Sequence, residues 1–381
     1  MSADLIVFGE DWASHPSSTQ HLIRHLPGER SVLWVNSIGM RRPRFGIADF
    51  GRMLRKIGGA LRPRSTPAAS PTAAAPGAPT RVVQPLILPM ARSRLLRALN
   101  RALLARSVGG VALQMKLRRP VLWLSLPSAV DAVGALHESA VVYYCGDDFA
   151  ALAGVDHEAA HAMEAELASR ADLILAASPM LAARFPTFKT RLLPHGVDFD
   201  LFATPAPRAA DMPTEAPVAG FYGALAPWLD LELIAATARL LPHWRFVMIG
   251  PVQTDLAPLR GCPNINLLRA RPHAALPGYS QHWTAGIIPF LDNAQIRASN
   301  PLKLREYLAA GRPIVSTDFP ALAPYRAHVR VAAGADAFAA ALEASRQDNP
   351  EASRARQQAV AGESWAARAA EVAALLERLT L

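Results

Sequence analysis

Short and almost uninterrupted apolar runs alternate along the chain with stretches that have helical spacing. The runs are DLIVFG, SVLWVN, PVLWLS, AVVYYC and DLILAAS in the first half, and VAGFYG, WRFVMIG, INLL, AGIIPF, PIVST and VRVAA in the second. Strands that are apolar on both faces are typical of parallel sheets covered by helices on each side. The pattern therefore predicts an α/β protein with two Rossmann-like, doubly wound parallel-sheet domains.

A break in this pattern divides the chain. Residues 205–217 are rich in proline and alanine and show neither strand nor helix periodicity, which predicts a linker. We expect an N-terminal domain over 1–204 and a C-terminal domain that begins at residue 218. Ligands of doubly wound folds bind beyond the carboxyl ends of the strands, so we expect the site in a cleft that the two domains face.

Positive charge is concentrated in one part of the N-terminal domain. The net charge is +9, yet residues 41–119 hold seventeen lysines and arginines against one acid, Asp49. We interpret this region as a basic insertion with a mobile Pro/Ala-rich loop over 63–79. Within it, residues 93–119 place leucines at helical spacing with arginines between them. Such a helix either lies on an anionic membrane surface or packs on the core with a solvated arginine face, and both interpretations stay open.

Composition excludes several other classes of protein. The chain has no uncharged apolar run of 18 residues and its first ten residues do not resemble a signal peptide, which predicts a cytoplasmic protein; contact with the inner face of the plasma membrane stays open. Cys145 and Cys262 are expected to be reduced and structural. No histidine or acid has metal-ligand spacing, and the basic region has few aromatics, so neither a metal site nor nucleic-acid binding is expected.

The stretch NPLKLREY places a cation at the start of a helix. Asn300 suits an N-cap and Pro301 the first helical position, so Lys303 falls in the first turn, where a cation costs about 0.3 to 1 kcal/mol. A bound phosphate would remove this cost, whereas the alternative is a solvated lysine. Glu306 lies three residues on and shares the helix face, so it could accept hydrogen bonds from ribose hydroxyls while Lys303 neutralises a diphosphate.

Two further loops of the C-terminal domain suit the same ligand. In GFYGALAPW a strand ends at Gly223, and a helix is expected to begin near Trp228, so Gly223 and Ala224 would let the backbone approach a phosphate. The loop LLRARPHAALPGY follows the third strand of the C-terminal domain. Backbone atoms near Ala270 and Arg271 could hold a base there.

The segments HGVDFDLF, GFYGALAPWLDLELIAATARLLPHWRFVMIGP and IIPFLDNAQIRASNPLKLREYLAAGRPIVST together resemble GT-B glycosyltransferases. The resemblance is to the bacterial branch that includes teichuronic acid and exopolysaccharide transferases. It covers essentially the whole chain and is strongest over 190–320. It implies a nucleotide-sugar domain over 218–362, a last helix over 363–381 that returns to the acceptor-binding N-terminal domain, and contacts of Gly223 and Lys303 with the diphosphate and Glu306 with the ribose.

One position departs from this family. Its large retaining branch carries a second glutamate eight residues before the position of Glu306, where this chain has Ala298. Arg297, Ser299 and Asn300 are the neighbours that could contact the sugar or phosphate instead. The departure leaves inversion or retention open, and an inverting reaction needs a general base.

Acids after a buried strand of the N-terminal domain are candidates for that base. Asp147 and Asp148 follow AVVYYC, and the xanthan glucuronosyltransferase of a related branch favours this choice by analogy; the alternative is that one of them caps the next helix. We favour Asp147. The loop after the first strand carries Asp11 and Ser17 as acceptor-side candidates and His15 as a second candidate base.

These inferences describe a metal-independent glycosyltransferase without a cofactor. It would move a sugar from a nucleoside diphosphate donor, with UDP favoured, to a lipid-linked or glycan acceptor in cell-surface or exopolysaccharide synthesis. A nucleotide-sugar epimerase of the same fold and a non-catalytic scaffold that binds sugar nucleotides are the alternatives. The donor sugar, the acceptor, the linkage and the oligomeric state stay open.

Overall fold

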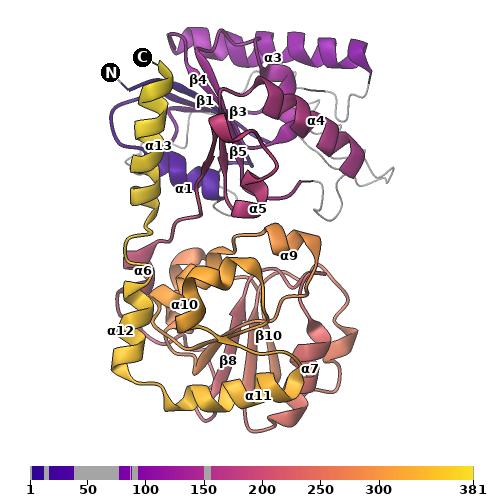
Figure 1. Ribbon diagram of the computed structural model, residues 1–381, viewed down its shortest axis with the longest axis vertical. Coiled ribbons are helices and arrows are strands. Elements are labelled where there is room, and N and C mark those ends of the chain that lie inside the picture. The colour runs from indigo at the N-terminus through magenta and orange to yellow at the C-terminus, as the bar shows by residue number, and fades with distance from the viewer. Residues whose placement is uncertain are drawn as a thin grey trace. The chain divides into compact units, whose positions relative to one another are not determined.

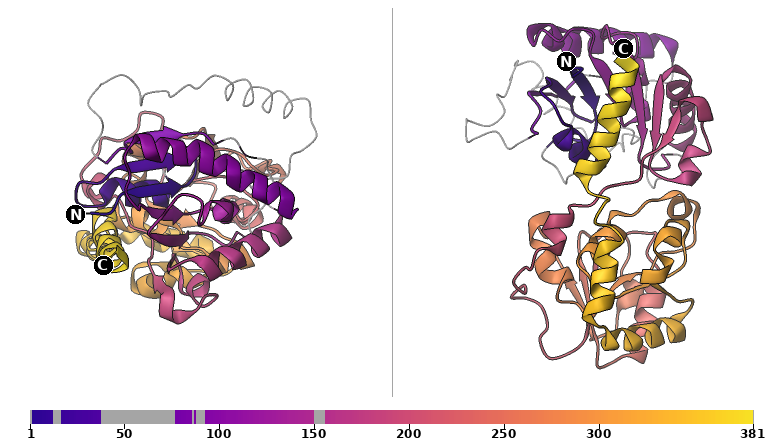
Figure 2. Two further views of the ribbon diagram at one scale, coloured as in Figure 1. Left: turned by 90° about the horizontal axis from the view of Figure 1, so that it is seen from above. Right: turned by 60° about the vertical axis from the view of Figure 1, so that its left-hand side comes forward.

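A computed structural model describes residues 2–12, 17–37, 77–85, 87, 93–149 and 156–380. The chain forms two compact units, one made of residues 1–194 and 368–381 and the other of residues 195–367. The figures colour the chain from indigo to yellow along the sequence (Figure 1, Figure 2). His15 and most of the basic insertion, residues 41–76, 86 and 88–92, lie outside the described residues.

The first unit is built on a seven-stranded sheet in which every pairing is parallel. The strand order is β3-β2-β1-β4-β5-β6-β7. The strands are β1 (Leu5–Phe8), β2 (Val32–Val35), β3 (Arg81–Val83), β4 (Val121–Leu124), β5 (Ala140–Cys145), β6 (Leu173–Ala176) and β7 (Thr190–Leu192). The central strands are buried along their whole length, as continuous apolar runs require.

The second unit repeats this plan with six parallel strands in the order β10-β9-β8-β11-β12-β13. They are β8 (Val218–Tyr222), β9 (Arg245–Ile249), β10 (Ile265–Leu268), β11 (Ala285–Ile288), β12 (Ile314–Ser316) and β13 (Arg330–Val331). In both sheets the order reverses beside the first strand, which is the switch point where doubly wound folds bind their ligands. The prediction of two Rossmann-like parallel-sheet domains is confirmed.

Helices connect the strands of each unit. Those of the first unit are α1 (Ser18–His25), α3 (Arg94–Gln114), η1 (Pro127–Ala132), α4 (His157–Arg170), α5 (Pro179–Ala182) and η2 (Thr187–Lys189). Those of the second are α6 (Phe199–Ala203), α7 (Leu231–Leu240), η3 (Ala257–Leu259), η4 (His273–Ala275), α8 (Pro277–Ser280), α9 (Ala294–Ala298), α10 (Leu302–Ala309), η5 (Pro320–His328), α11 (Ala335–Ala344), η6 (Ser345–Gln347) and α12 (Pro350–Gln358).

The last helix, α13 (Trp365–Thr380), contributes residues 368–380 to the first unit. Its Glu377 lies close enough to Arg30 for its charge to act on the pKa of that arginine. The yellow helix α13 accordingly lies near the indigo start of the chain in all three views (Figure 1, Figure 2). The first unit is thus assembled from both ends of the sequence.

Eleven of the described strands coincide with the predicted apolar runs. The two that sequence reasoning missed, β3 and β7, are three-residue edge strands with arginine among their residues, so they lack the continuous apolarity of central strands. Segment 205–217, predicted as a linker, packs against the second unit. Met212 belongs to the core of that unit, and the Ala206 amide donates to Gln281 Oε1 at 2.8 Å.

Candidate donor site and candidate base

A glycine follows the carboxyl end of β8 and another follows that of β9, and the backbone conformation at both positions favours glycine. Gly223 has a φ of +135° and Gly250 a φ of +153°, a region that side chains other than glycine rarely adopt. A Cβ on Gly250 would lie 1.9 Å from the carbonyl oxygen of Gly223. The loops beyond are joined by a hydrogen bond from the Leu225 amide to the Pro251 carbonyl at 2.9 Å. This close approach leaves a glycine-lined turn beyond β8, the strand beside which the order reverses.

Lys303 extends from the first turn of α10 toward this turn. Its Nζ lies 3.3 Å from where a Cβ on Gly223 would stand, and 5.4 Å from the ring centres of both Phe221 and Phe290. The predicted cap was wrong in detail: α10 begins at Leu302, with Pro301 as its N-cap and no side-chain cap bond. The first amides of a helix have no intrahelical acceptor, so this terminus keeps its affinity for an anion.

The ammonium of Lys303 makes cation–π contacts with aromatic rings and no ion pair with a carboxylate of the described residues. Burial lowers the pKa of Lys303, and the charge of Glu306 opposes that shift. Among the residues that the structure describes, Lys303 makes no hydrogen bond and no ion pair. A partly desolvated ammonium without a counter-anion is costly, and it gains most from an anionic ligand.

Glu306 is buried and both of its carboxylate oxygens are engaged. Tyr222 donates its hydroxyl to Oε2 at 2.8 Å, and His273 Nε2 lies 3.0 Å from Oε1. Burial acts to lower the pKa of His273, but the hydrogen bond and charge of Glu306, with the charge of Asp198, outweigh it and raise that pKa. Each carboxylate oxygen has two lone pairs, so Glu306 retains capacity to accept a further hydrogen bond.

Arg305, two residues after Lys303, has a different environment on the same helix. Its side chain is 4% exposed, its Nε lies 2.6 Å from Glu363 Oε2, and a second nitrogen donates to Asn300 Oδ1. Tyr325 stacks beneath the guanidinium at 5.4 Å and donates its hydroxyl to Glu363. Asn300, expected to cap the helix or contact the ligand, therefore uses its side chain to hold Arg305.

His195 lies beside this arginine. Burial lowers the pKa of His195 to about 3, with the charge of Arg305 acting in the same direction and a hydrogen bond with the Asn300 backbone opposing it. The imidazole also contacts Trp365, with ring centres 6.2 Å apart. A neutral histidine beside a buried arginine adds no further positive charge to the start of α10.

The other donor-side candidates use their side chains locally. Arg271 donates to Asp211 at 2.6 Å and to the Tyr279 hydroxyl at 2.9 Å, while neighbouring Ala270 is exposed. Arg297 binds Asp292 through two nitrogens at 2.6 and 2.7 Å. None of these contacts points to a ligand, so the assignments of Ala270 and Arg271 to a base stay predictions.

The candidate residues at the end of α9 also use their side chains within the protein. Ser299 donates its hydroxyl to the Ile296 carbonyl at 2.8 Å, which closes the last turn of the helix. Ala298 is buried. The roles of Arg297 and Ser299 in sugar or phosphate contacts stay predictions. Ala224, next to Gly223, is partly buried in the glycine turn.

The two acids after β5 have different surroundings in the first unit. Asp148 accepts from Arg184 at 2.8 Å, and Arg184 also pairs with the buried Glu164. Asp147 is exposed, and its carboxylate makes no hydrogen bond or ion pair with the described part of the chain. Surrounding protein, and then the charges of Glu10 and Asp148, raise the pKa of Asp147 to about 6. Because the side chain keeps access to water, we give most weight to the two like charges.

Neither acid is a helix cap in the described structure. The next described helix, α4, is capped by Asp156, which accepts from the Ala159 amide. The contrast between the paired Asp148 and the unpaired Asp147 agrees with the preference for Asp147, although no described contact tests its role. A carboxyl group with a pKa near 6 is mostly ionised at neutral pH and could still accept a proton.

Two of the acceptor-side candidates, Asp11 and Ser17, make hydrogen bonds within the first unit. Asp11 accepts from the amide of Ser37 at 3.0 Å and from its hydroxyl at 2.7 Å. Ser17 caps α1 by accepting from the Gln20 amide. His15 lies outside the described residues. Acceptor contacts of Asp11 and Ser17 stay predictions.

Two features are absent from the described residues, a metal-binding cluster and a membrane-spanning helix. No cluster of three or more histidine, cysteine or acidic side chains that could hold a metal ion occurs there. None of the described helices combines the length and apolarity needed to cross a bilayer. Both cysteines are buried and unbridged, as predicted.

Sequence reasoning missed four side chains around the start of α10. Tyr222 is the last residue of β8, His273 lies two residues beyond Arg271, and Arg305 faces away from Lys303 on α10. His195 opens the segment that resembles the family. The loop containing His273 had been singled out, but the sequence gives no signal that its histidine rather than its arginine reaches Glu306.

No protein-family model matches the chain. A curated relative from Bacillus subtilis (strain 168), named "Putative teichuronic acid biosynthesis glycosyltransferase TuaH", is 29% identical over 223 residues. The match covers 53% of this chain and 56% of the relative, so the chain spans about half the length of the curated relative it matches.

Solved structures match over nearly the whole chain. HepE from Anabaena, solved in complex with UDP-glucose, is 12% identical, covers 99% of this chain and 97% of its own, and has a TM-score of 0.58. An α,α-trehalose-phosphate synthase (UDP-forming) from Burkholderia vietnamiensis is 14% identical, with coverages of 99% and 100% and a TM-score of 0.64. At identities this low, the structural similarity shows a shared fold and nothing more. That fold is GT-B.

Proposed function

We propose that this chain, which has the GT-B glycosyltransferase fold, transfers a sugar from a nucleoside diphosphate donor to a lipid-linked or glycan acceptor. The observation that carries the proposal is Lys303, a partly buried cation without a carboxylate partner among the described residues, aimed at the turn of Gly223. A diphosphate is the ligand that satisfies both the ammonium and the amides at the start of α10.

The proposed donor is UDP-linked. The support is comparative, because HepE was solved with UDP-glucose and the Burkholderia synthase is described as UDP-forming. Within this chain, Lys303 and Gly223 would contact the diphosphate and Glu306 would accept from a ribose hydroxyl. Tyr222 and His273 would hold the Glu306 carboxylate in a fixed orientation for that contact.

The proposed reaction is a direct displacement. The acceptor oxygen forms a bond to the anomeric carbon while the bond from that carbon to the diphosphate oxygen breaks, and its electron pair leaves with the diphosphate. Lys303 stabilises the charge that develops there, and Asp147 takes the proton of the acceptor hydroxyl. This assignment is inverting, in keeping with Ala298 at the position of the second glutamate of the retaining branch. A role in polysaccharide synthesis is supported by the name of the Bacillus relative, which refers to teichuronic acid biosynthesis; the acceptor class is part of the proposal.

The first test is calorimetric titration of the full chain with UDP, GDP and their glucose conjugates, alongside Lys303→Ala. We expect binding of one nucleotide, weakened in the variant by at least about 1.5 kcal/mol, or roughly twelvefold, as for a lost charge-assisted contact. Lys189→Ala is the matched control, because it removes the same charge from the first unit and leaves the proposed site intact. Equal binding by Lys303→Ala and the parent protein would remove Lys303 from the donor site.

Product analysis then separates the alternatives. An epimerase converts the sugar nucleotide without an acceptor, whereas a transferase releases UDP in proportion to glycosylated acceptor. A non-catalytic scaffold binds the nucleotide, yields neither product and is unaffected by Asp147→Asn. Conversion of the sugar nucleotide without an acceptor, or nucleotide binding with neither product, would overturn the transferase while leaving the donor site standing.

A further inference from the structure

Helix α3 has one face that packs within the first unit. Its buried residues recur every four positions: Asn100, Leu104, Val108 and Ala112. This spacing keeps one stripe of the helix against the protein. The core-packed interpretation of this segment is therefore correct for one of its faces.

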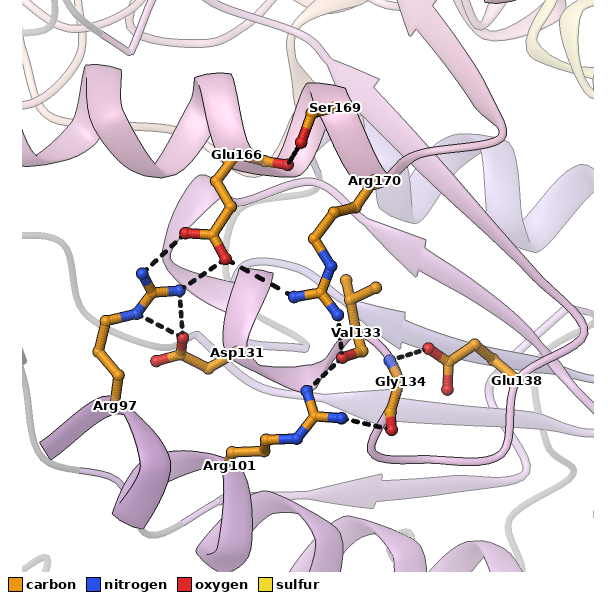
Figure 3. A network of polar contacts seen from close by, with 9 residues as sticks. All are labelled: Arg97, Arg101, Asp131, Val133, Gly134, Glu138, Glu166, Ser169 and Arg170. Atoms are coloured by element: carbon orange, nitrogen blue, oxygen red, sulfur yellow. Dashed lines mark hydrogen bonds and ion pairs between the residues drawn. The ribbon is translucent and has the colours of Figure 1, made fainter. Parts of the chain in front are cut away.

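Two of the arginines of α3 serve to fix the helix in place. Arg97 donates to Asp131 at 2.7 Å and to both carboxylate oxygens of Glu166 at 2.7 and 2.9 Å (Figure 3). Arg101 donates to the carbonyls of Val133 and Gly134 (Figure 3). These contacts with η1, its following turn and α4 use the charge of both arginines and fix the rotation of α3 about its axis.

The opposite face of α3 is exposed and carries leucines near both of its ends, with Arg106 between them. Leu95 is 84% exposed and Leu113 80%, with Leu99 at 47% and the flanking Leu96 at 43%. Leu95, Leu99 and Leu113 project from one side of the helix, because their spacing follows its period, and Arg106 lies on the same side. Leu96 lies at the edge of that side. Leucines gathered on one exposed helix face indicate an interaction surface, whereas single exposed leucines need no explanation. We call this set of four leucines the α3 face.

The exposed charged side chains of α3 and of the residues just after it are all positive. The sequence has no acidic residue from position 50 to position 130. The exposed cations on and just beyond the helix are Arg94, Arg106, Lys116, Arg118 and Arg119. Lys116 and Arg119 have φ values of +58° and +47°, where a residue other than glycine costs about 1 to 2 kcal/mol. The end of the helix thus carries cations at positions where glycine would be more stable.

We propose that the α3 face docks on an anionic lipid bilayer. The leucines would enter the boundary between headgroups and acyl chains, and the surrounding cations would contact the headgroup phosphates. A second copy of this chain fits poorly, because a symmetric contact would bring the same cations together. A nucleic acid fits poorly too, because segment 84–119 has no aromatic residue to stack on bases. The inference does not depend on the proposed transferase activity.

Vesicle co-sedimentation of the full chain tests this proposal. One set of vesicles contains phosphatidylcholine alone and the other contains phosphatidylcholine with phosphatidylglycerol. The variant is Leu95→Gln with Leu99→Gln, since glutamine keeps the helix propensity of leucine. Leu240→Gln is the matched control, because Leu240 is an exposed leucine on α7 in the other unit, at 48%.

We expect sedimentation with the anionic vesicles only. The double variant should bind them at least tenfold more weakly, and Leu240→Gln should bind like the parent. Arg106→Gln should weaken binding about fivefold, as expected for one cation near an anionic surface. Absence of vesicle binding, or binding that the leucine changes leave intact, would overturn the proposal. A dimer in size-exclusion chromatography that the double variant dissociates, without vesicle binding, would assign the α3 face to a second copy instead.

Discussion

Each unit contains two neighbouring charged residues whose surroundings differ sharply. On α10, Arg305 is buried against Glu363, whereas Lys303 has aromatic rings around its ammonium and no acidic partner among the described residues. After β5, Asp148 pairs with Arg184, whereas Asp147 is exposed beside like charges. A paired charge stabilises the fold that holds it. A charge that is desolvated without a partner, like Lys303, or set beside like charges, like Asp147, costs free energy, so its presence indicates a ligand or a reaction.

The largest effect is expected at Asp147. If it is the general base, Asp147→Asn should lower kcat at least about 100-fold, because general base catalysis contributes 10² to 10⁴. Binding of the donor nucleotide should not change. In the parent protein, kcat should fall as pH decreases below about 6, the raised pKa of this carboxyl, since the protonated form accepts no proton. Steady-state kinetics between pH 5 and 8 measure both effects.

Asp148→Asn is the control for this experiment. It removes a partly buried ion pair and should lower the free energy of unfolding by about 1 kcal/mol while changing kcat only a fewfold. Equal losses of kcat in the two variants would show that the pairing of Asp148 with Arg184 does not distinguish their roles. A full loss in Asp148→Asn alone would reverse the assignment of the base.

On α10 the comparison predicts that the two substitutions change the stability of the fold differently. Arg305→Met removes the buried guanidinium that contacts Glu363 at 2.6 Å and should lower the free energy of unfolding by about 3 kcal/mol, the lower end for a broken buried pair because Glu363 is partly exposed. Lys303→Met should leave that free energy unchanged or raise it, because it removes a desolvated ammonium without a carboxylate partner among the described residues. Urea denaturation measures both. A stable Arg305→Met variant, or a destabilised Lys303→Met variant, would contradict the division between structural and ligand-directed charge.

The sequence predicted the fold well because buried parallel strands are continuous apolar runs. It missed β3 and β7, since an edge strand of three residues buries too little surface to need such a run. It also placed the start of α7 near Trp228, whereas the helix begins at Leu231 after its cap, Asp230. Two acceptable caps or turns within a few residues are nearly equal in energy locally, and tertiary contacts decide between them.

The candidate site was only partly predictable, because a residue type does not reveal its partner. Lys303, Arg305, Arg271 and Arg297 look alike in the sequence, yet three of them bind nearby acids. The geometry of Lys303 depends on Gly223 and Phe290, which lie far from it along the chain. Only a description of long-range contacts separates a cation that is already neutralised from one that is not.

Gly223→Ala tests the geometry around Lys303 with a smaller change. The added Cβ would lie 3.1 Å from Lys303 Cε, at a φ that alanine rarely adopts. We expect nucleotide binding to weaken by about 1 kcal/mol as the ammonium and the turn shift apart. Gly334→Ala is the matched control, since Gly334 also has a positive φ of +78° but no atom within 4 Å of the added Cβ. Equal nucleotide affinity in the parent and both variants would mean that the ligand does not approach the Gly223 turn.

The smallest effect concerns Glu306. It differs from Lys303 and Arg305 because its partner, His273, can lose its charge. The raised pKa of His273 means that the imidazolium pair with Glu306 stabilises the folded state fully below the ordinary pKa of 6.5. This contribution is lost as pH rises through the raised pKa. His273→Gln should therefore lower the free energy of unfolding more at pH 6 than at pH 8.5, by less than about 1 kcal/mol.

Urea denaturation of the parent protein and His273→Gln at both pH values measures this difference, with His243→Gln as the control. His243 also pairs with a glutamate, Glu343, but its side chain is 55% exposed, so solvent screens the pair and its loss should cost little. A constant difference between the parent and His273→Gln across this range would show that His273 holds Glu306 as a neutral donor. Glu306 would then keep one orientation over the whole range, and nucleotide binding should be equally insensitive to the protonation of His273.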